Sequence, residues 1–353
     1  MAQTSDPRWA PPKHLSWVDQ RLLRTVRDER DLIFPQVALR ITGIVLPLAV
    51  LMVLLPTRWM LLFELPYIAF VFTQFTGRFS LMCHALMHRP TFKKEFAWVQ
   101  TWIFWGLGPL FGATPTSFNA HHVGMHHPEN NLATDLSCTL PYQRDQFTDW
   151  LHYWARFFFP GLLHLVRYLR LRGRDKLARQ LIIGELSWVG FVIALAWIDP
   201  AGAIGVVVVP FLLLRVLLMC GNFAQHAFVD IDDPANPYRN STCIINTRYN
   251  HKCYNDGYHI VHHLKPNLHW SEMAQWYDDR KDEFARQDAI VFDGLQDNLH
   301  VFVLLMTHDY DTLAAHLVDF HGRTKDEKIA FLKGRVQRRL GEKKGIFAFE
   351  PAI

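Results

Sequence analysis

The chain has 353 residues, of which 50% are apolar and 20% are charged, and its formal net charge is +4 at pH 7. This composition excludes an intrinsically disordered chain, and the length excludes a small disulfide-stapled protein. The five cysteines form no C-x-x-C pair, which excludes a zinc ribbon or a clustered iron–sulfur site. The mild net charge favours no particular partner, and we expect no nucleic-acid partner. Histidine is unusually frequent, with 19 residues, most of which fall in tight clusters.

Four long apolar segments follow a polar N-terminal segment, residues 1–36. They are residues 37–55, 59–83, 181–198 and 201–224. Each approaches the length of about 20 residues that crosses roughly 30 Å of hydrocarbon. The breaks within each pair are so short that the segments form two helical hairpins. Because the segments are long and paired, we disfavour the alternative of buried helices in a soluble protein.

The basic residues predict the orientation of these hairpins. The segment between them carries many arginines, including Arg167, Arg170 and Arg172, whereas the tight hairpin turns carry only Arg58. Basic loops stay in the cytoplasm, so both termini and the middle segment are predicted to be cytoplasmic. Two further apolar stretches, residues 96–111 and 150–171, are predicted to lie in the membrane interface. The expected fold is an all-α membrane protein with four transmembrane helices in two hairpins and a cytosolic helical cap.

Most of the histidines occur at helical spacing. The clusters are His84-x3-His88, His121-His122-x3-His126-His127, Asn222-x3-His226 and His259-x2-His262-His263. Residues three or four apart share one face of a helix, so each cluster directs its side chains one way. Adjacent residues point about 100° apart, so a histidine doublet can serve two metals. Under the predicted orientation all four clusters lie on the cytoplasmic side.

The number and type of these ligands favour a two-metal site. Imidazole suits zinc, copper, iron and nickel, whereas a structural zinc takes four ligands that often include cysteine. The clustered imidazoles exceed what one zinc needs, and neither a cysteine nor an acid-rich motif joins them. Neutral nitrogen ligands around two irons suit the activation of dioxygen.

This ordered set of motifs in a four-span chain resembles the membrane-bound fatty acid desaturase–hydroxylase superfamily over about residues 37–275. The resemblance implies two irons at the cytosolic ends of the helices, with dioxygen as co-substrate. His121 competes with His122, and we favour His122 because it stands at i, i+4 with His126. The residues that match the family's ligands are His84, His88, His122, His126, His127, His226, His259, His262 and His263.

Other residues are expected to support these ligands. Asn222 matches an asparagine that approaches one iron through water in the family. Metal-bound histidines usually donate their second N–H to a carboxylate or carbonyl, and Asp230 and Asp256 are the best candidates by their closeness to the motifs. We divide the chain into a cytosolic N-terminal segment (1–36), a catalytic membrane domain with the histidine motifs (37–275) and a cytosolic helical region (276–353).

The resemblance implies dioxygen-dependent removal of hydrogen from a fatty acid or fatty acyl chain. Desaturation, oxidative decarboxylation of a free fatty acid to a terminal alkene, and hydroxylation of a fatty acid or alkane remain open. The stretch 257–263 followed by Leu268-His269-Trp270 is more similar to acyl desaturases and alkene-forming decarboxylases than to alkane hydroxylases. The compact chain resembles bacterial members, so we expect a multi-pass protein of the inner membrane with a cytoplasmic active site. Without a cytochrome b5 motif or a cysteine cluster, it needs an external donor, a ferredoxin or a cytochrome with its reductase.

Two alternatives belong to other classes. A transporter or sensor could bind zinc or copper through the same histidines, but transport sites lie near the bilayer midplane on broken helices. Here the predicted ligands lie at span ends and in cytosolic segments. A bis-histidine heme protein would need paired histidines on facing helices rather than doublets.

Overall fold

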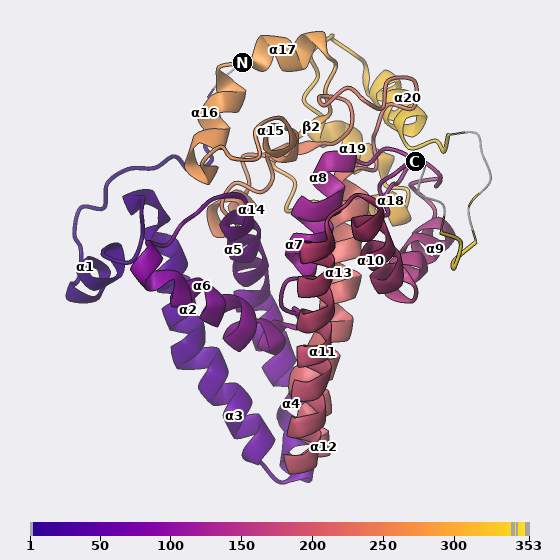
Figure 1. Ribbon diagram of the computed structural model, residues 1–353. Helices are drawn as coiled ribbons and strands as arrows, with labels where there is room; N and C mark the ends of the chain where they lie inside the picture. Colours follow the sequence, from indigo (N-terminus) through magenta and orange to yellow (C-terminus); the bar gives the residue numbers. More distant parts are fainter. Residues whose placement is uncertain (1–2, 340–342, 344, 350–353) are drawn as a thin grey trace. The chain divides into compact units, whose positions relative to one another are not determined.

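The computed structural model describes residues 3–339, 343 and 345–349, and most of them are helical (Figure 1). The chain divides into two compact units. The membrane unit consists of Trp9–Val123 and Arg174–Arg215, and the C-terminal unit consists of Met1–Arg8, Gly124–Gly173 and Val216–Ile353.

Within the described residues, four helices are long and apolar enough to cross a membrane: Glu29–Leu54, Thr57–His88, Asp175–Ile198 and Pro200–Gln225. They confirm the predicted integral membrane protein and its four spans. Each helix extends beyond the apolar run that predicted it, because helical hydrogen bonding continues into the polar residues at the span ends. The spans are built from α2 (Ile33–Arg40), α3 (Leu46–Leu54), α4 (Thr57–Val71), α5 (Gly77–His88), α11 (Asp175–Ile198), α12 (Pro200–Ala203) and α13 (Val209–Gln225).

π-helical turns interrupt three of the spans. They are η2 (Ile41–Val45), η3 (Phe72–Thr76) and η8 (Ile204–Val208). In the first two, threonine side chains compete with the backbone: Thr42 Oγ1 donates to Ala38 O at 2.8 Å and Thr73 Oγ1 donates to Ala69 O at 2.7 Å. Such bonds from a side chain to the preceding turn loosen the regular i to i+4 pattern and favour the wider turn.

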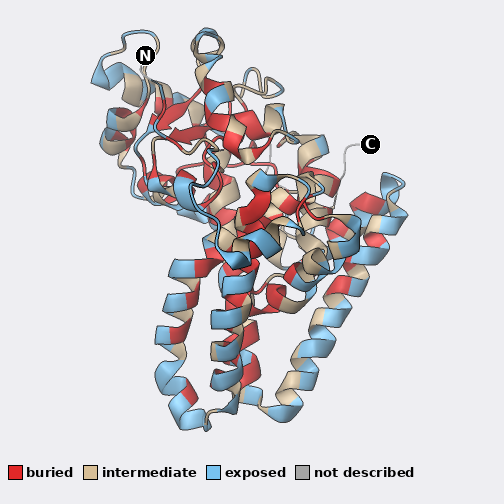
Figure 2. Cartoon of the chain, turned by 90° about the vertical axis from the view of Figure 1, so that its left-hand side faces the viewer, coloured by how far each residue is buried: buried red, intermediate tan, exposed pale blue. Residues whose placement is uncertain are grey.

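The second hairpin turns sharply at Asp199. Its carboxylate accepts a hydrogen bond from Gly202 N at 2.9 Å, and Pro200 occupies the first helical position of α12. A Cβ atom on Gly202 would lie 3.0 Å from Val53 Cα, so this glycine allows α12 to pack directly on α3. The outer faces of these helices are apolar and exposed, with Leu54 72% and Trp197 86% exposed (Figure 2). Such surfaces are suited to lipid rather than to water.

The rest of the membrane unit consists of short helices. Residues 96–111, predicted to lie in the interface, form a broken helix that is not among the spanning helices of the described chain. The interfacial position of this segment stays a prediction. The elements are α1 (Trp17–Leu23), η4 (Lys94–Phe96), α6 (Ala97–Thr101), η5 (Trp102–Leu107), η6 (Gly108–Phe111) and α7 (Ser117–His121).

The C-terminal unit is a set of helices packed around several apolar clusters, of which two are large. One core contains Phe223, Phe228 and Phe292, and the other contains Tyr258 and Phe284. The helices are α8 (His127–Glu129), α9 (Phe147–Phe158), α10 (Gly161–Leu171), the end of α13, α14 (Arg248–Lys252), α15 (His259–Leu264), η9 (Trp270–Glu272), α16 (Met273–Asp278), α17 (Lys281–Arg286), α18 (Asn298–Met306), α19 (Tyr310–His316) and α20 (Lys325–Arg335).

One feature of this unit was not predicted. Strands β1 (Cys243–Ile245) and β2 (Val291–Asp293) pair in parallel, with Ile244 opposite Phe292. Each strand has three residues, which is too short to show a period of two in the sequence. The pairing joins the segment after α13 to the segment before α18.

Candidate metal centre

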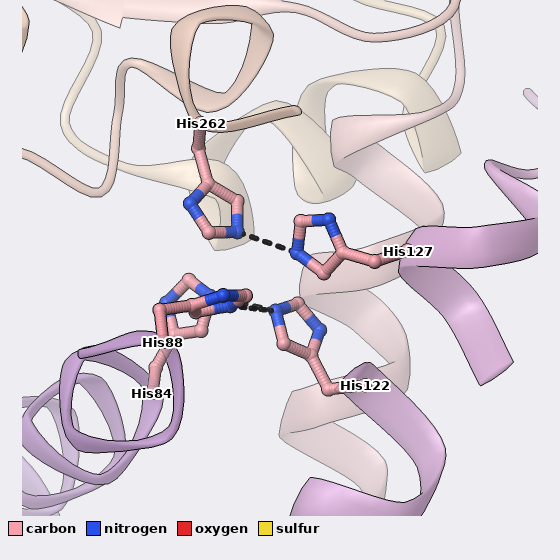
Figure 3. Close-up of side chains that lie close together, drawn as sticks. All are labelled: His84, His88, His122, His127 and His262. Carbon is pink, nitrogen blue, oxygen red and sulfur yellow. Dashed lines mark hydrogen bonds between the residues drawn. The ribbon is translucent and has the colours of Figure 1, made fainter. Parts of the chain in front are cut away.

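Three of the predicted ligands converge within the membrane unit (Figure 3). His84 and His88 lie one turn apart on α5, and His122 begins the π-helical turn η7 (His122–His126) that follows α7. The Nε2 atom of His122 lies 2.7 Å from that of His84 and 3.1 Å from that of His88. His122, and not its competitor His121, thus belongs to the group that could hold a metal.

Four more predicted ligands converge within the C-terminal unit. His126, His226, His259 and His263 place their ligand nitrogens within 4.8 Å of one another. The Nε2 atom of His259 lies 3.2 Å from that of His226 and 3.0 Å from that of His263. We call these residues the four-histidine group. His126, His226 and His259 are buried in it.

The last two predicted ligands form a pair in the same unit. His127 Nε2 and His262 Nε2 are 2.8 Å apart, and their rings stand at 79° to each other (Figure 3). Each is the chain neighbour of a member of the four-histidine group, as expected for doublets whose rings point about 100° apart on a helix.

The spacing of these nitrogens fits a metal. Nitrogen ligands about 2.1 Å from a metal and at right angles to each other lie about 3 Å apart. That is the separation seen at His122 and at His259, each of which has two nitrogen neighbours at 2.7–3.2 Å. Each ring nitrogen of a neutral imidazole carries either one N–H or one lone pair, so it cannot donate to one neighbouring nitrogen and accept from the other, whereas a single cation can accept the lone pairs of all three.

Supporting side chains hold two rings of the four-histidine group. His126 Nδ1–H donates to Asp135 Oδ2 at 2.7 Å, and His226 Nδ1–H donates to Asn240 O at 2.9 Å and Asn240 Oδ1 at 3.1 Å. These bonds select the tautomer whose Nε2 lone pair is available to a metal. Asn240 is itself fixed, because its amide donates to Pro234 O and to Asn130 O.

Asp135 is the carboxylate that the sequence analysis missed. It is 4% exposed and accepts hydrogen bonds from Asn131 N, Ser137 N and the Ser137 hydroxyl at 2.7–2.9 Å. Its only signal in the sequence is an acid in a segment of short polar residues after the second cluster. Choosing acids by closeness to the other motifs favoured Asp230 and Asp256 instead.

The other predicted supporting residues have contacts of their own. Asp230 pairs with Arg239 at 3.5 Å and with Arg335 at 3.3 Å. Asp256 accepts hydrogen bonds from Tyr249 OH at 2.5 Å and from Gln225 Nε2 at 3.5 Å. Their support of metal ligands stays a prediction.

Asn222 lies one turn before His226 on α13, as its spacing predicted. Its Nδ2 atom donates to Tyr153 OH at 2.6 Å. This bond orients the amide, because the nitrogen faces Tyr153 and the oxygen faces the other way. Its predicted approach to a metal through water stays a prediction.

Burial keeps these histidines in the form that binds metal. Burial, with a smaller contribution from His126, lowers the pKa of His226 to about 3. Burial, followed by the nearby His259, lowers the pKa of His263 well below its usual value. Both rings are therefore neutral near pH 7, and a neutral imidazole is the form that coordinates a metal.

The fold and these groups together define an integral membrane protein with an all-histidine site suited to metal. Comparison with known families identifies the class: the fatty acid desaturase family profile matches residues 57–294. This range contains all nine predicted ligands and more than half of the chain. The protein belongs to the fatty acid desaturase family and is a desaturase-like oxidoreductase, and the family implies a fatty acyl substrate. No curated protein and no solved structure matches the chain.

Proposed function

We propose that this enzyme uses dioxygen to introduce a double bond into a fatty acyl chain, with two irons held by the nine histidines. One iron is proposed at the four-histidine group, and the family resemblance implies that the second iron takes its ligands from the other histidines of the nine. The convergence of four imidazoles around a buried point, with Asp135 and Asn240 behind two of them, is the observation that carries the proposal. Asn222 is proposed to contribute through a water molecule.

Irons bound at these groups supply the oxidising power that removes hydrogen from an unactivated methylene. The chain's own residues supply position and a dry environment. Asp135 and Asn240 fix the rings of His126 and His226, which are 1% and 0% exposed. The neutral imidazoles would add no negative charge to the site, so two bound metals would keep their full positive charge there.

The electron balance requires a partner. Reduction of dioxygen to two waters takes four electrons, and forming one double bond from two methylenes releases two. The other two come from an external donor, which we propose is a ferredoxin or a cytochrome with its reductase. The sequence has neither a cysteine cluster nor a heme motif that would supply them internally.

We also propose the placement of the enzyme. The basic residues between the hairpins support an orientation with both termini and the histidine motifs on the cytoplasmic side of a bacterial inner membrane. Residues 37–275 would then form the catalytic domain, between a cytosolic N-terminal segment and the cytosolic region 276–353.

Product analysis tests the reaction. The chain is expressed in a bacterium with and without an added donor system, and lipids and headspace volatiles are measured by mass spectrometry. A newly unsaturated acyl chain is the expected product. A hydroxylated chain would show instead that the same site catalyses hydroxylation. A shortened terminal alkene would show that it catalyses oxidative decarboxylation.

Metal analysis tests the class of site independently. Purified protein is expected to contain two irons per chain. One zinc or copper per chain, with no dioxygen-dependent product, would favour a transporter or sensor, and a Soret band would favour a heme protein.

A further inference from the structure

The N-terminal residues Thr4–Arg8, here called the N-terminal strap, lie against the segment that carries the last histidine motif. Two of its side chains reach the same carboxylate: Thr4 Oγ1 donates to Asp278 Oδ2 at 3.0 Å, and Arg8 forms an ion pair with Asp278. Asn255 Nδ2 donates to Pro7 O at 2.8 Å. The strap is therefore fixed at both ends and in its middle.

The central residue of the strap is a buried acid. Asp6 is 4% exposed, and its carboxylate accepts three hydrogen bonds. The donors are Asn246 N at 2.6 Å, Thr247 N at 3.1 Å and Tyr258 OH at 2.7 Å. Bonds to an ionised acceptor are roughly twice as strong as neutral ones, so this carboxylate is a firm junction between its donors.

The donors belong to two different segments. Asn246 and Thr247 follow strand β1, and Asn246 has a left-handed backbone with φ of 55°. Tyr258 is fully buried and stands directly before His259, and its carbonyl accepts from His262 N at 2.9 Å in the first turn of α15. Asp6 therefore ties the end of β1 to the residue from which the helix with His259, His262 and His263 begins.

The backbone just before Tyr258 is held closely against strand β1. Gly257 O accepts from Ile244 N at 2.7 Å, and a Cβ atom on Gly257 would lie 2.4 Å from Ile244 O. The main chain before α15 is thus packed closely against β1, and the Tyr258 side chain is bonded to Asp6. The orientation of the first turn of α15 depends on this junction.

We infer that Asp6 is a positioning residue for the last histidine motif, acting through Tyr258 to set the angle at which His259 and His263 meet the metal. The inference rests on the proposed function, and it assigns a role to a residue outside the family-matched range 57–294. Asp6 is not a member of the histidine groups that could hold a metal. It acts on the site through its hydrogen bond with Tyr258 OH and through the first turn of α15, which begins at the next residue.

Cobalt binding tests this without turnover. Full-length protein is purified in detergent, stripped of metal with a chelator and titrated with Co²⁺, which imidazole sites bind and whose visible absorption reports ligand geometry. Asp6→Asn retains the size of the side chain but removes Oδ2, the oxygen that accepts from Asn246 N and from Tyr258 OH. Tyr258→Phe retains the ring and loses the same bond from the other side. Arg8→Gln is the matched control, because it removes a strap contact, the ion pair with Asp278, that does not involve Tyr258.

Each of the two variants is expected to weaken Co²⁺ binding about tenfold, at the lower end of what outer supporting partners contribute, and to change the absorption band in the same way. The double variant is expected to bind Co²⁺ no more weakly than the weaker single variant, because the bond that Tyr258→Phe removes is already lost in Asp6→Asn. Arg8→Gln should bind Co²⁺ as the unmodified protein does.

Two results would overturn the inference alone, and a third would overturn the proposed metal site on which it rests. A lowered melting temperature of Asp6→Asn with unchanged Co²⁺ affinity and spectrum would make the strap merely structural. Additive losses in the double variant would show that Asp6 and Tyr258 act separately. If the unmodified protein binds no Co²⁺, the proposed metal site itself fails, and this inference fails with it.

Discussion

The two histidine sets reach similar nitrogen spacings by different means. In the membrane unit, His84 and His88 are half-buried neighbours on one regular helix, and the spacing of α5 alone brings their rings to one face. In the C-terminal unit, the four-histidine group is drawn from three segments, and Asp135 and Asn240 hold two of its rings. On a regular helix, local spacing alone can bring metal ligands together. A buried group drawn from several segments depends in addition on supporting residues outside its motifs.

The largest effect is expected from removing a ligand of the four-histidine group. His126→Ala deletes a metal ligand and leaves the buried Asp135 carboxylate without its imidazole partner, which costs about 2 kcal/mol in addition. We expect turnover to be lost and bound iron to fall, as measured by product formation and metal analysis. Normal turnover in protein that has lost its iron would refute the ligand assignment.

The next effect distinguishes the supporting carboxylates. Asp135→Asn keeps the shape of the side chain but weakens the bond to His126 Nδ1, and we expect metal affinity to fall about 10- to 100-fold. Asp230→Asn is the matched control, because the contacts of Asp230 are to Arg239 and Arg335. Titration of the metal-free proteins measures both. A larger loss in the Asp230 variant would favour the choice made from the sequence.

Removing the metals should increase hydrogen exchange more in the loop that supports His126 than in α5, which carries His84 and His88. The amides of Asn131, Ser137 and Thr139 bond to side chains of the loop that supports His126, whereas the α5 amides bond within their own helix. We expect hydrogen exchange in 131–139 to accelerate about tenfold after chelation and that in α5 to change less. Hydrogen-exchange mass spectrometry measures both segments in one sample. Equal acceleration would mean that α5 also depends on the metal.

The smallest effects are expected at histidines outside the motifs. His300 lies in α18 and His316 ends α19, where its Nδ1 donates to the Asp293 carbonyl. Alanine at either position should leave iron content and turnover nearly unchanged. Complete loss of iron in one of these variants would show that the ligand set was drawn from the wrong histidines.

Much of the fold was predictable because its signals are local. Long apolar runs separated by two or three polar residues indicate paired spans whatever the rest of the chain does, and the structure has the four spans at the predicted places. The histidine spacings are equally local, since residues three or four apart share a helix face. The strand pair β1–β2 had no such signal, because its segments are short and distant in the chain.

The membrane spans, the family and the histidine clusters could be predicted from the residues alone, because each depends on periodicity or spacing within a few turns of helix. The partners of these groups became visible only in the folded chain: Asp135 bonds to His126, Asn240 to His226, and Asp6 to Tyr258. These are hydrogen bonds from side chains in irregular segments, formed across as many as 252 positions of the chain. No period in the sequence encodes such a bond, because its geometry exists only after the intervening segments have folded.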